Sequence, residues 1–243
     1  MSSSPVAASR QARLGVRLGI GAALLIAAAW LFGAIAADVA SGDRLTVLDA
    51  QVARWLRARA TPEVTPWMLL VTHLHSTVAV SCYAAVAGAV LAWRRQWRSV
   101  TTLLVCVAGG LTLNVLMKLA FQRARPVLDD PLLTLATYSF PSGHVAGSTI
   151  LYGLIVAWVF TRTRRPLVRV AVVIAAAAAI ALVAFTRMYL GVHYLSDVVA
   201  AFAEGVAWLA LCVGALTAFW ARPTLPAAAI ASRGAGGWSA RRS

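Results

Sequence analysis

Three short segments of the chain combine basic side chains with histidines, a hydroxyl group and a carboxylate. In chain order they are Lys118-x6-Arg125-Pro126, Pro141-Ser142-Gly143-His144 and Arg187-x5-His193-x3-Asp197. Fixed cations hold the oxygens of a phosphate group, and two histidines can serve as a nucleophile and a general acid. These residue types therefore indicate chemistry at an anionic phosphorus centre.

Two of the segments also carry local structural signals. Ser142 can cap a helix that begins after Pro141, and the free N–H groups at a helix start bind anions. His193 and Asp197 are four residues apart, so on a helix they share one face. There the carboxylate can hold one tautomer of the imidazole and stabilise its cation. Taken alone, ordinary helix capping and a structural His–Asp pair explain each segment as well.

Composition predicts the elements that must position these segments. The chain has 243 residues, 60% of them hydrophobic and 12% charged, and a mean hydropathy of +0.78. Average soluble domains carry about 25% charged residues, so a soluble globule and a disordered chain are both excluded. We expect an all-α polytopic membrane protein with six spanning helices of about 20 residues each. The six stretches are 18–37, 67–93, 100–117, 145–160, 167–185 and 198–220.

The distribution of charge predicts how these spans are oriented. Fourteen of the 22 basic residues, and none of the eight acidic ones, lie at the two termini and in the second and fourth connections. By the positive-inside rule this side is cytoplasmic, and the three segments above face outward. The net charge of +14 is thereby explained without a nucleic-acid partner. We therefore expect a cytoplasmic segment over 1–17, the membrane domain over 18–220 and a disordered, basic cytoplasmic tail over 221–243.

The first outward connection, residues 41–66, differs from the others. Its apolar residues recur at helical spacing among arginines, which predicts a short periplasmic helix on the membrane surface. These residues are Leu45, Leu48, Val52, Trp55 and Leu56. Arg123 and the four arginines of this connection are expected to make surface contacts only. His73 and His75 lie near the start of the second span, outside the three segments, and an interfacial role is favoured for both.

The three segments, their order and the six-span plan together resemble the type 2 phosphatidic-acid phosphatase family of lipid phosphate phosphatases, related to vanadium haloperoxidases. The resemblance covers about residues 48–197, and Thr186 stands where members usually have serine. It implies that His193 is the nucleophile of a phosphohistidine intermediate, that Asp197 orients His193, and that His144 protonates the leaving oxygen.

The resemblance also implies a phosphate-binding set and a class of substrate. Lys118, Arg125 and Arg187 would hold the phosphate oxygens, and Ser142 and the Gly143 amide would add donors, with no metal or other cofactor. The implied substrate is a phosphorylated lipid, such as undecaprenyl pyrophosphate, phosphatidylglycerophosphate or phosphatidic acid. One lysine against 21 arginines hints at a high-GC bacterium and its inner membrane.

Other functions stay open on the sequence alone. A lipid-linked phosphotransferase would use the same residues with a different phosphate acceptor. A non-catalytic lipid-phosphate binding or transport protein would keep only the anion site, and a haloperoxidase would place vanadate there. The identity of the lipid and the oligomeric state are not defined by the sequence.

Overall fold

The computed structural model describes residues 5–128, 132–133 and 135–221. This part of the chain contains eight α-helices and no strand, which confirms the all-α fold class. Most of the predicted tail, from residue 222 on, and the first four residues of the predicted N-terminal segment lie outside the described residues. The helices are α1 (Pro5–Ser41), α2 (Arg44–Arg57), α3 (Thr65–Leu74), α4 (Thr77–Trp93), α5 (Trp97–Phe121), α6 (Gly143–Arg162), α7 (Pro166–Tyr189) and α8 (Leu195–Ala221).

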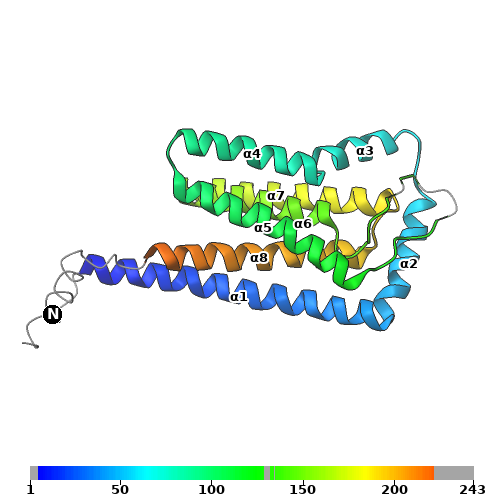
Figure 1. Cartoon of the computed structure of the whole chain (residues 1–243), viewed down its shortest axis with the longest axis horizontal. Coiled ribbons are helices and arrows are strands. Elements are labelled where there is room, and N and C mark those ends of the chain that lie inside the picture. Colours follow the sequence, from blue (N-terminus) through cyan, green and yellow to red (C-terminus); the bar gives the residue numbers. More distant parts are fainter. Residues whose placement is uncertain (1–4, 129–131, 134, 222–243) are drawn as a thin grey trace, which may run out of the picture.

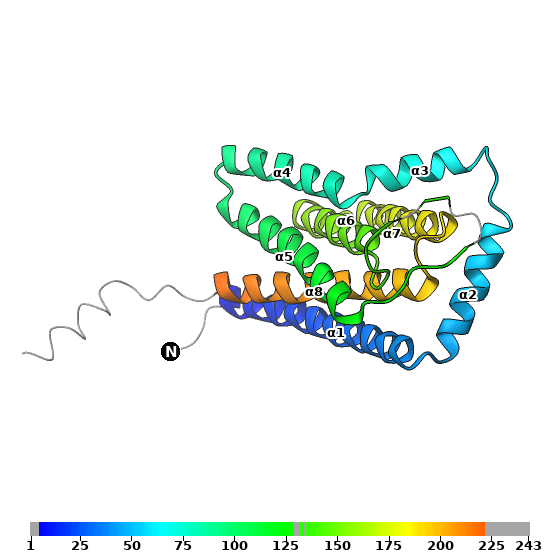
Figure 2. The same cartoon turned by 45° about the vertical axis from the view of Figure 1, so that its right-hand side comes forward.

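The long helices form an elongated bundle, and one short helix crosses its end. α1 and α8 lie side by side along the bundle, and α6 packs between α7 and α8 (Figure 1). α3 and α4 follow one another along the opposite side (Figure 2). α2 runs across the end of the bundle where α5 ends and α8 begins, as both views show.

Five helices of the described chain are long and apolar enough to cross a membrane: residues 14–41 of α1, and all of α5, α6, α7 and α8. α3 and α4 pass the same test only as a pair, bent by 41°. Many large apolar side chains lie exposed on the outside of the bundle, and two examples are Trp93 and Leu167, which are 84% and 83% exposed. Exposed apolar surface of this extent is unusual for a protein in water.

The prediction of one continuous helix over 67–93 is wrong, because the helix is interrupted at His75 and Ser76. The Ser76 hydroxyl caps the new helix by accepting a hydrogen bond from the Ala79 amide at 3.1 Å. The His75 ring bonds the Val71 carbonyl at 2.8 Å and the Tyr152 hydroxyl at 2.7 Å. The break is therefore built into the packing of α3 against its neighbours.

The predicted short helix in 41–66 is present as α2, and its location on a membrane surface stays a prediction. Its apolar residues do not all face the same way. Leu56 is buried together with Asp49 and Ala53, whereas Leu48 and Trp55 are exposed. α2 therefore packs one face on the bundle and leaves a second apolar face outside.

Small residues let the long helices approach closely, as is common in membrane bundles. A side chain at Gly205 of α8 would meet Thr149 and the Ala146 carbonyl of α6 at 2.8 and 3.3 Å.

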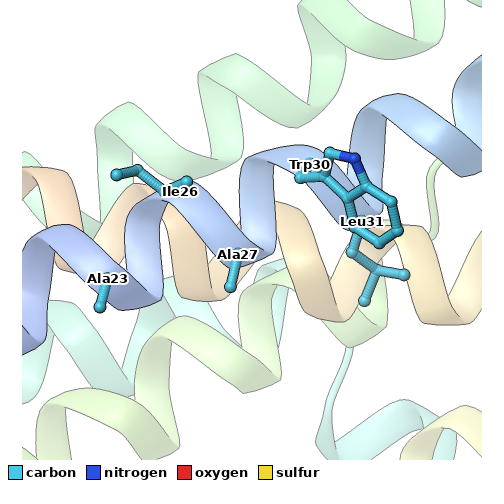
Figure 3. A pocket seen from close by; sticks show the side chains of 5 residues that line it. All are labelled: Ala23, Ile26, Ala27, Trp30 and Leu31. Carbon is cyan, nitrogen blue, oxygen red and sulfur yellow. The ribbon is translucent and has the colours of Figure 1, made fainter.

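The hollow drawn in Figure 3 lies on a single helix and not between helices. It is lined by five apolar residues of α1 alone, from Ala23 to Leu31, and they include no polar side chain.

Candidate active site

The bundle brings the three motif segments to one end, the end that α2 crosses (Figures 1 and 2). Lys118 lies in the last turn of α5 and Arg187 in the last turn of α7. His144 lies in the first turn of α6, Asp197 in the first turn of α8, and His193 in the connection just before α8. Helix ends are therefore the elements that position most of the predicted site residues.

His193 and Asp197 form the predicted pair, with 3.3 Å between His193 Nδ1 and Asp197 Oδ2. The expectation that they share a helical face is wrong, because α8 begins only at Leu195. Asp197 is the third residue of α8, and its carboxylate also accepts from the backbone N–H of Tyr194 at 2.9 Å. This is one of the two hydrogen bonds of a capping box, the one from the third helical residue back to the N-cap amide, so the same carboxylate caps α8 and holds the imidazole.

The His193 ring is almost completely buried, with 3% of the residue exposed. Burial lowers the pKa of His193 to about 3, although Asp197 works in the opposite direction. The imidazole is therefore neutral at pH 7. With Nδ1 directed at Asp197, the second ring nitrogen, Nε2, faces a guanidinium nitrogen of Arg125 at 3.3 Å. Nε2 thus offers its lone pair toward the basic residues of the site.

Arg187 is 1% exposed, and only one of its side-chain nitrogens has a hydrogen-bond partner among the described residues. One terminal nitrogen donates to the Thr72 hydroxyl of α3 at 2.5 Å. Nε and the other terminal nitrogen have no hydrogen-bond partner within the described part of the chain. An unpaired buried donor costs about 1–3 kcal/mol, and more when it is charged. Such a fork is satisfied by two oxygens of a phosphate group.

Arg125 and Lys118 are held by backbone carbonyls of the α5–α6 connection, and Arg125 also by one of the α7–α8 connection. Arg125 donates to the carbonyls of Thr137 and Val192 at 2.7 and 2.5 Å. Lys118 Nζ and Arg125 share the Tyr138 carbonyl, at 2.9 and 3.1 Å. Burial lowers the pKa of Arg125, and Asp197 partly offsets this. The two cations are thereby fixed near each other, and no carboxylate of the described residues is bound directly to either.

The start of α6 supplies the remaining predicted groups. Ser142 occupies the N-cap position but makes no side-chain cap, contrary to the prediction. Its hydroxyl oxygen is buried and, among the described residues, has no partner. A Cβ at Gly143 would lie 3.1 Å from Asn114 Oδ1, so glycine allows α6 to begin against α5. His144 is within electrostatic range of Lys118, Arg125, Arg187 and His193.

The prediction that Arg123 makes only surface contacts is wrong. One of its guanidinium nitrogens lies 2.6 Å from Asp197 Oδ1, and the other lies 2.7 Å from Asp49 Oδ2. Burial lowers its pKa, but the two carboxylates more than offset this, so the pKa is raised. The Ser139 hydroxyl also donates to Asp197. Together these groups surround the carboxylate that holds His193.

Asp49 and Arg123 carry different sequence signals. Asp49 occupies the same helical stripe as Ala53 and Leu56, at i+4 and i+7, so an acidic residue on the inward face could have been noticed. Arg123 has no such pattern, because its partners lie 74 residues away on either side. Thr186 is buried and donates to the Val183 carbonyl at 2.7 Å, so its hydroxyl bonds its own helix.

The two histidines of the second predicted span differ in their surroundings. Both ring nitrogens of His75 are bonded at the break between α3 and α4, and His73 is exposed. Among the described residues, no group of three or more His, Cys, Asp or Glu side chains is placed to hold a metal ion.

Comparisons with known proteins give one matching family profile and one similar sequence. A profile of the PAP2 superfamily matches residues 99–221. Phosphatidylglycerophosphatase B of Bacillus subtilis (strain 168) is 31% identical over 152 residues, which are 58% of this chain and 71% of that protein.

Two solved structures are similar in fold. The crystal structure of a transmembrane PAP2 type phosphatidylglycerolphosphate phosphatase from Bacillus subtilis aligns with a TM-score of 0.70 and 25% identity, over 83% of this chain and 98% of that one. The crystal structure of Aquifex aeolicus LpxE aligns with a TM-score of 0.54 and 19% identity, over 68% of this chain and 94% of that one. The second likeness is one of fold alone.

Proposed function

The chain belongs to the PAP2 superfamily, and from this premise we propose that it hydrolyses a phosphate or pyrophosphate bond of a membrane lipid. One observation carries the proposal. The buried Arg187 fork has two donors without a partner among the described residues, and it lies at the end of the bundle that also holds the neutral His193 and its partner Asp197. An anion site beside a buried, oriented nucleophile fits phosphoryl transfer better than binding alone.

In the proposed first step, His193 Nε2 attacks phosphorus in line. A bond forms between Nε2 and phosphorus while the bond from phosphorus to the leaving oxygen breaks, and His144 gives that oxygen a proton. Asp197 keeps the proton of the imidazole on Nδ1 and stabilises the positive charge that develops on the ring. The product is a phosphohistidine and a free lipid alcohol, or a lipid monophosphate from a pyrophosphate.

In the second step, water attacks the phosphohistidine. The oxygen of water bonds to phosphorus as the phosphorus–Nε2 bond breaks, and His144 accepts the proton of the water. Inorganic phosphate leaves, and His193 returns to its neutral state. Each histidine therefore ends the cycle in the protonation state in which it began.

The three cations stabilise the charge on the phosphate oxygens in both steps. Arg187 supplies a planar fork, and Lys118 supplies a point charge. Arg125, which now contacts His193 Nε2, is placed to transfer that hydrogen bond to a phosphate oxygen when the substrate enters. The Ser142 hydroxyl and the Gly143 amide add neutral donors at the start of α6.

The proposed substrates are lipids whose phosphate lies at the membrane surface while the tail stays in the bilayer. The similarity to phosphatidylglycerophosphatase B favours phosphatidylglycerophosphate, and the same site chemistry fits undecaprenyl pyrophosphate and phosphatidic acid. We expect the purified protein in detergent to release inorganic phosphate from at least one of the three. Because protein cations carry the charge stabilisation, the rate should stay within about twofold when a chelator is added.

This experiment separates the proposed function from its alternatives. Inorganic phosphate should account for all of the phosphate lost from the lipid. Transfer of that phosphate to another lipid or sugar would identify a phosphotransferase instead. Lipid binding without turnover would identify a binding protein, and a rate that disappears with chelator and returns with a divalent cation would refute metal independence.

The proposed orientation places both termini in the cytoplasm and the site at the periplasmic face of the inner membrane. It rests on the 14 basic residues that the sequence has at its two termini and in the second and fourth connections between spans, because basic residues favour the cytoplasmic side. A cytoplasm-active reporter fused after Ser243 should therefore be active, whereas a periplasm-active reporter at the same position should be silent. The reverse result would place the site in the cytoplasm.

A further inference from the structure

Asp49 lies on the inner face of α2 and is 1% exposed. Its Oδ1 accepts from the backbone N–H of Ser196 at 2.9 Å, and its Oδ2 accepts from the Ser196 hydroxyl. Oδ2 also accepts from Arg123 at 2.7 Å. This single carboxylate therefore joins α2 to the first turn of α8 and to the connection that follows α5.

Arg123 continues this network to the proposed catalytic pair. Its other terminal nitrogen donates to Asp197 Oδ1 at 2.6 Å and to the Ser196 hydroxyl at 2.7 Å. The guanidinium also stacks on Tyr194, 4.3 Å from the centre of the ring. Arg123 is thus shared between two carboxylates, Asp49 on one side and Asp197 on the other.

The two oxygens of Asp197 face different partners. Oδ1 bonds Arg123, whereas Oδ2 faces His193 Nδ1, the Tyr194 N–H and the Ser139 hydroxyl. A carboxylate fixed at one oxygen cannot rotate freely about its bond to Cβ. The position of Arg123 therefore helps to set the direction of Oδ2 toward His193, together with the two other donors on that oxygen.

From this geometry we propose that Asp49 is a positioning residue for the reaction. It holds Arg123 between two carboxylates, so that Asp197 presents Oδ2 to His193. Without the charge of Asp49, Arg123 pairs with Asp197 alone and draws that carboxylate away from the imidazole. This inference rests on the proposed function, because His193 must be the reacting group for its orientation to affect the rate.

The test compares Asp49→Asn with Asp43→Asn in the full-length protein. Asp43 is exposed just before the same helix, and its carboxylate accepts a hydrogen bond from the Ser41 hydroxyl at 2.5 Å. We expect Asp49→Asn to lower kcat on the order of 10- to 100-fold, as residues that orient a reacting group do, with KM within about twofold. Asp43→Asn should match the wild type in both constants.

Asp49→Glu keeps the charge and should recover part of kcat. The Arg123→Lys variant should have a similar defect, and combining it with Asp49→Asn should lower kcat by much less than the product of the two single effects. Rates are divided by the amount of folded protein measured by size-exclusion chromatography, so an unstable variant is scored on its folded fraction alone.

The outcomes distinguish the two levels of inference. A wild-type protein that releases no phosphate from any lipid tested contradicts the proposed function itself. A wild-type protein that is active, with an Asp49→Asn variant that equals Asp43→Asn per folded molecule, overturns the role of Asp49 only. Equal losses in Asp49→Asn and Asp49→Glu, or fully multiplicative effects with Arg123→Lys, also overturn it.

Discussion

Replacing His193 with alanine should lower phosphate release by at least about 10⁴-fold, the order of loss found when a nucleophile is removed. The reason is that Nε2 is the one atom proposed to bond to phosphorus, and its neighbours are cations that cannot replace it. A quenched reaction with radiolabelled substrate should show label on the wild-type protein, stable in alkali and lost in acid. The variant should carry no label.

His73→Ala is the matched control, since His73 is an exposed histidine outside the site. It should keep the wild-type rate and the wild-type labelling. A His193→Ala protein that retains more than a tenth of the activity would contradict the assignment of the nucleophile. Retained label in that variant would direct the search to His144.

Replacing Arg187 with lysine should lower kcat/KM by about 10²- to 10³-fold, the effect of removing a donor aimed at the charge of a transition state. Lysine retains the charge but loses the planar pair of donors. The substitution removes all three guanidinium nitrogens, among them the two without partners in the described structure, Nε and one terminal nitrogen. The measurement is the initial rate of phosphate release over a range of lipid concentrations in mixed micelles.

Arg169→Lys provides the comparison on the same helix. Arg169 lies near the other end of α7 and donates to the carbonyls of Thr163 and Phe160 at 2.9 and 3.0 Å. Its replacement should leave kcat/KM unchanged within about twofold. If Arg187→Lys behaves like Arg169→Lys, the guanidinium fork is not a phosphate ligand, and its burial serves packing with Thr72.

The sequence alone predicts the helices well, because long apolar runs have few alternatives to helix in a bilayer. It also predicts that Lys118, His144, Arg187 and His193 come to one end. Successive spans run in opposite directions, so every second connection lies at the same end of the bundle. The break at His75 was not predicted, because a serine cap inside an apolar run gives no clear signal. Side-chain contacts made within α3 and with α6 fix that break.

The polar network around Asp197 was beyond prediction for a different reason. The pairing of Arg123 with Asp49 and Asp197 joins residues 74 positions apart on each side, and charge counting places all three in outward connections without pairing them. The Ser142 hydroxyl, which has no partner in the part of the chain that the structure describes, was likewise not predicted, since Pro-Ser-Gly before a helix predicts an ordinary cap. Three-dimensional packing decides which polar groups are left for a ligand.

The several partners of Asp197 have a practical consequence for capturing the protein with its lipid. An inactive variant made at Asp197 would release Arg123, Ser139 and the Tyr194 amide together, and α8 would lose its first-turn cap. A lipid complex obtained with such a variant would report a rearranged pocket. His193→Asn leaves all three donors on Asp197, so it is the better starting point for a substrate-trapped complex.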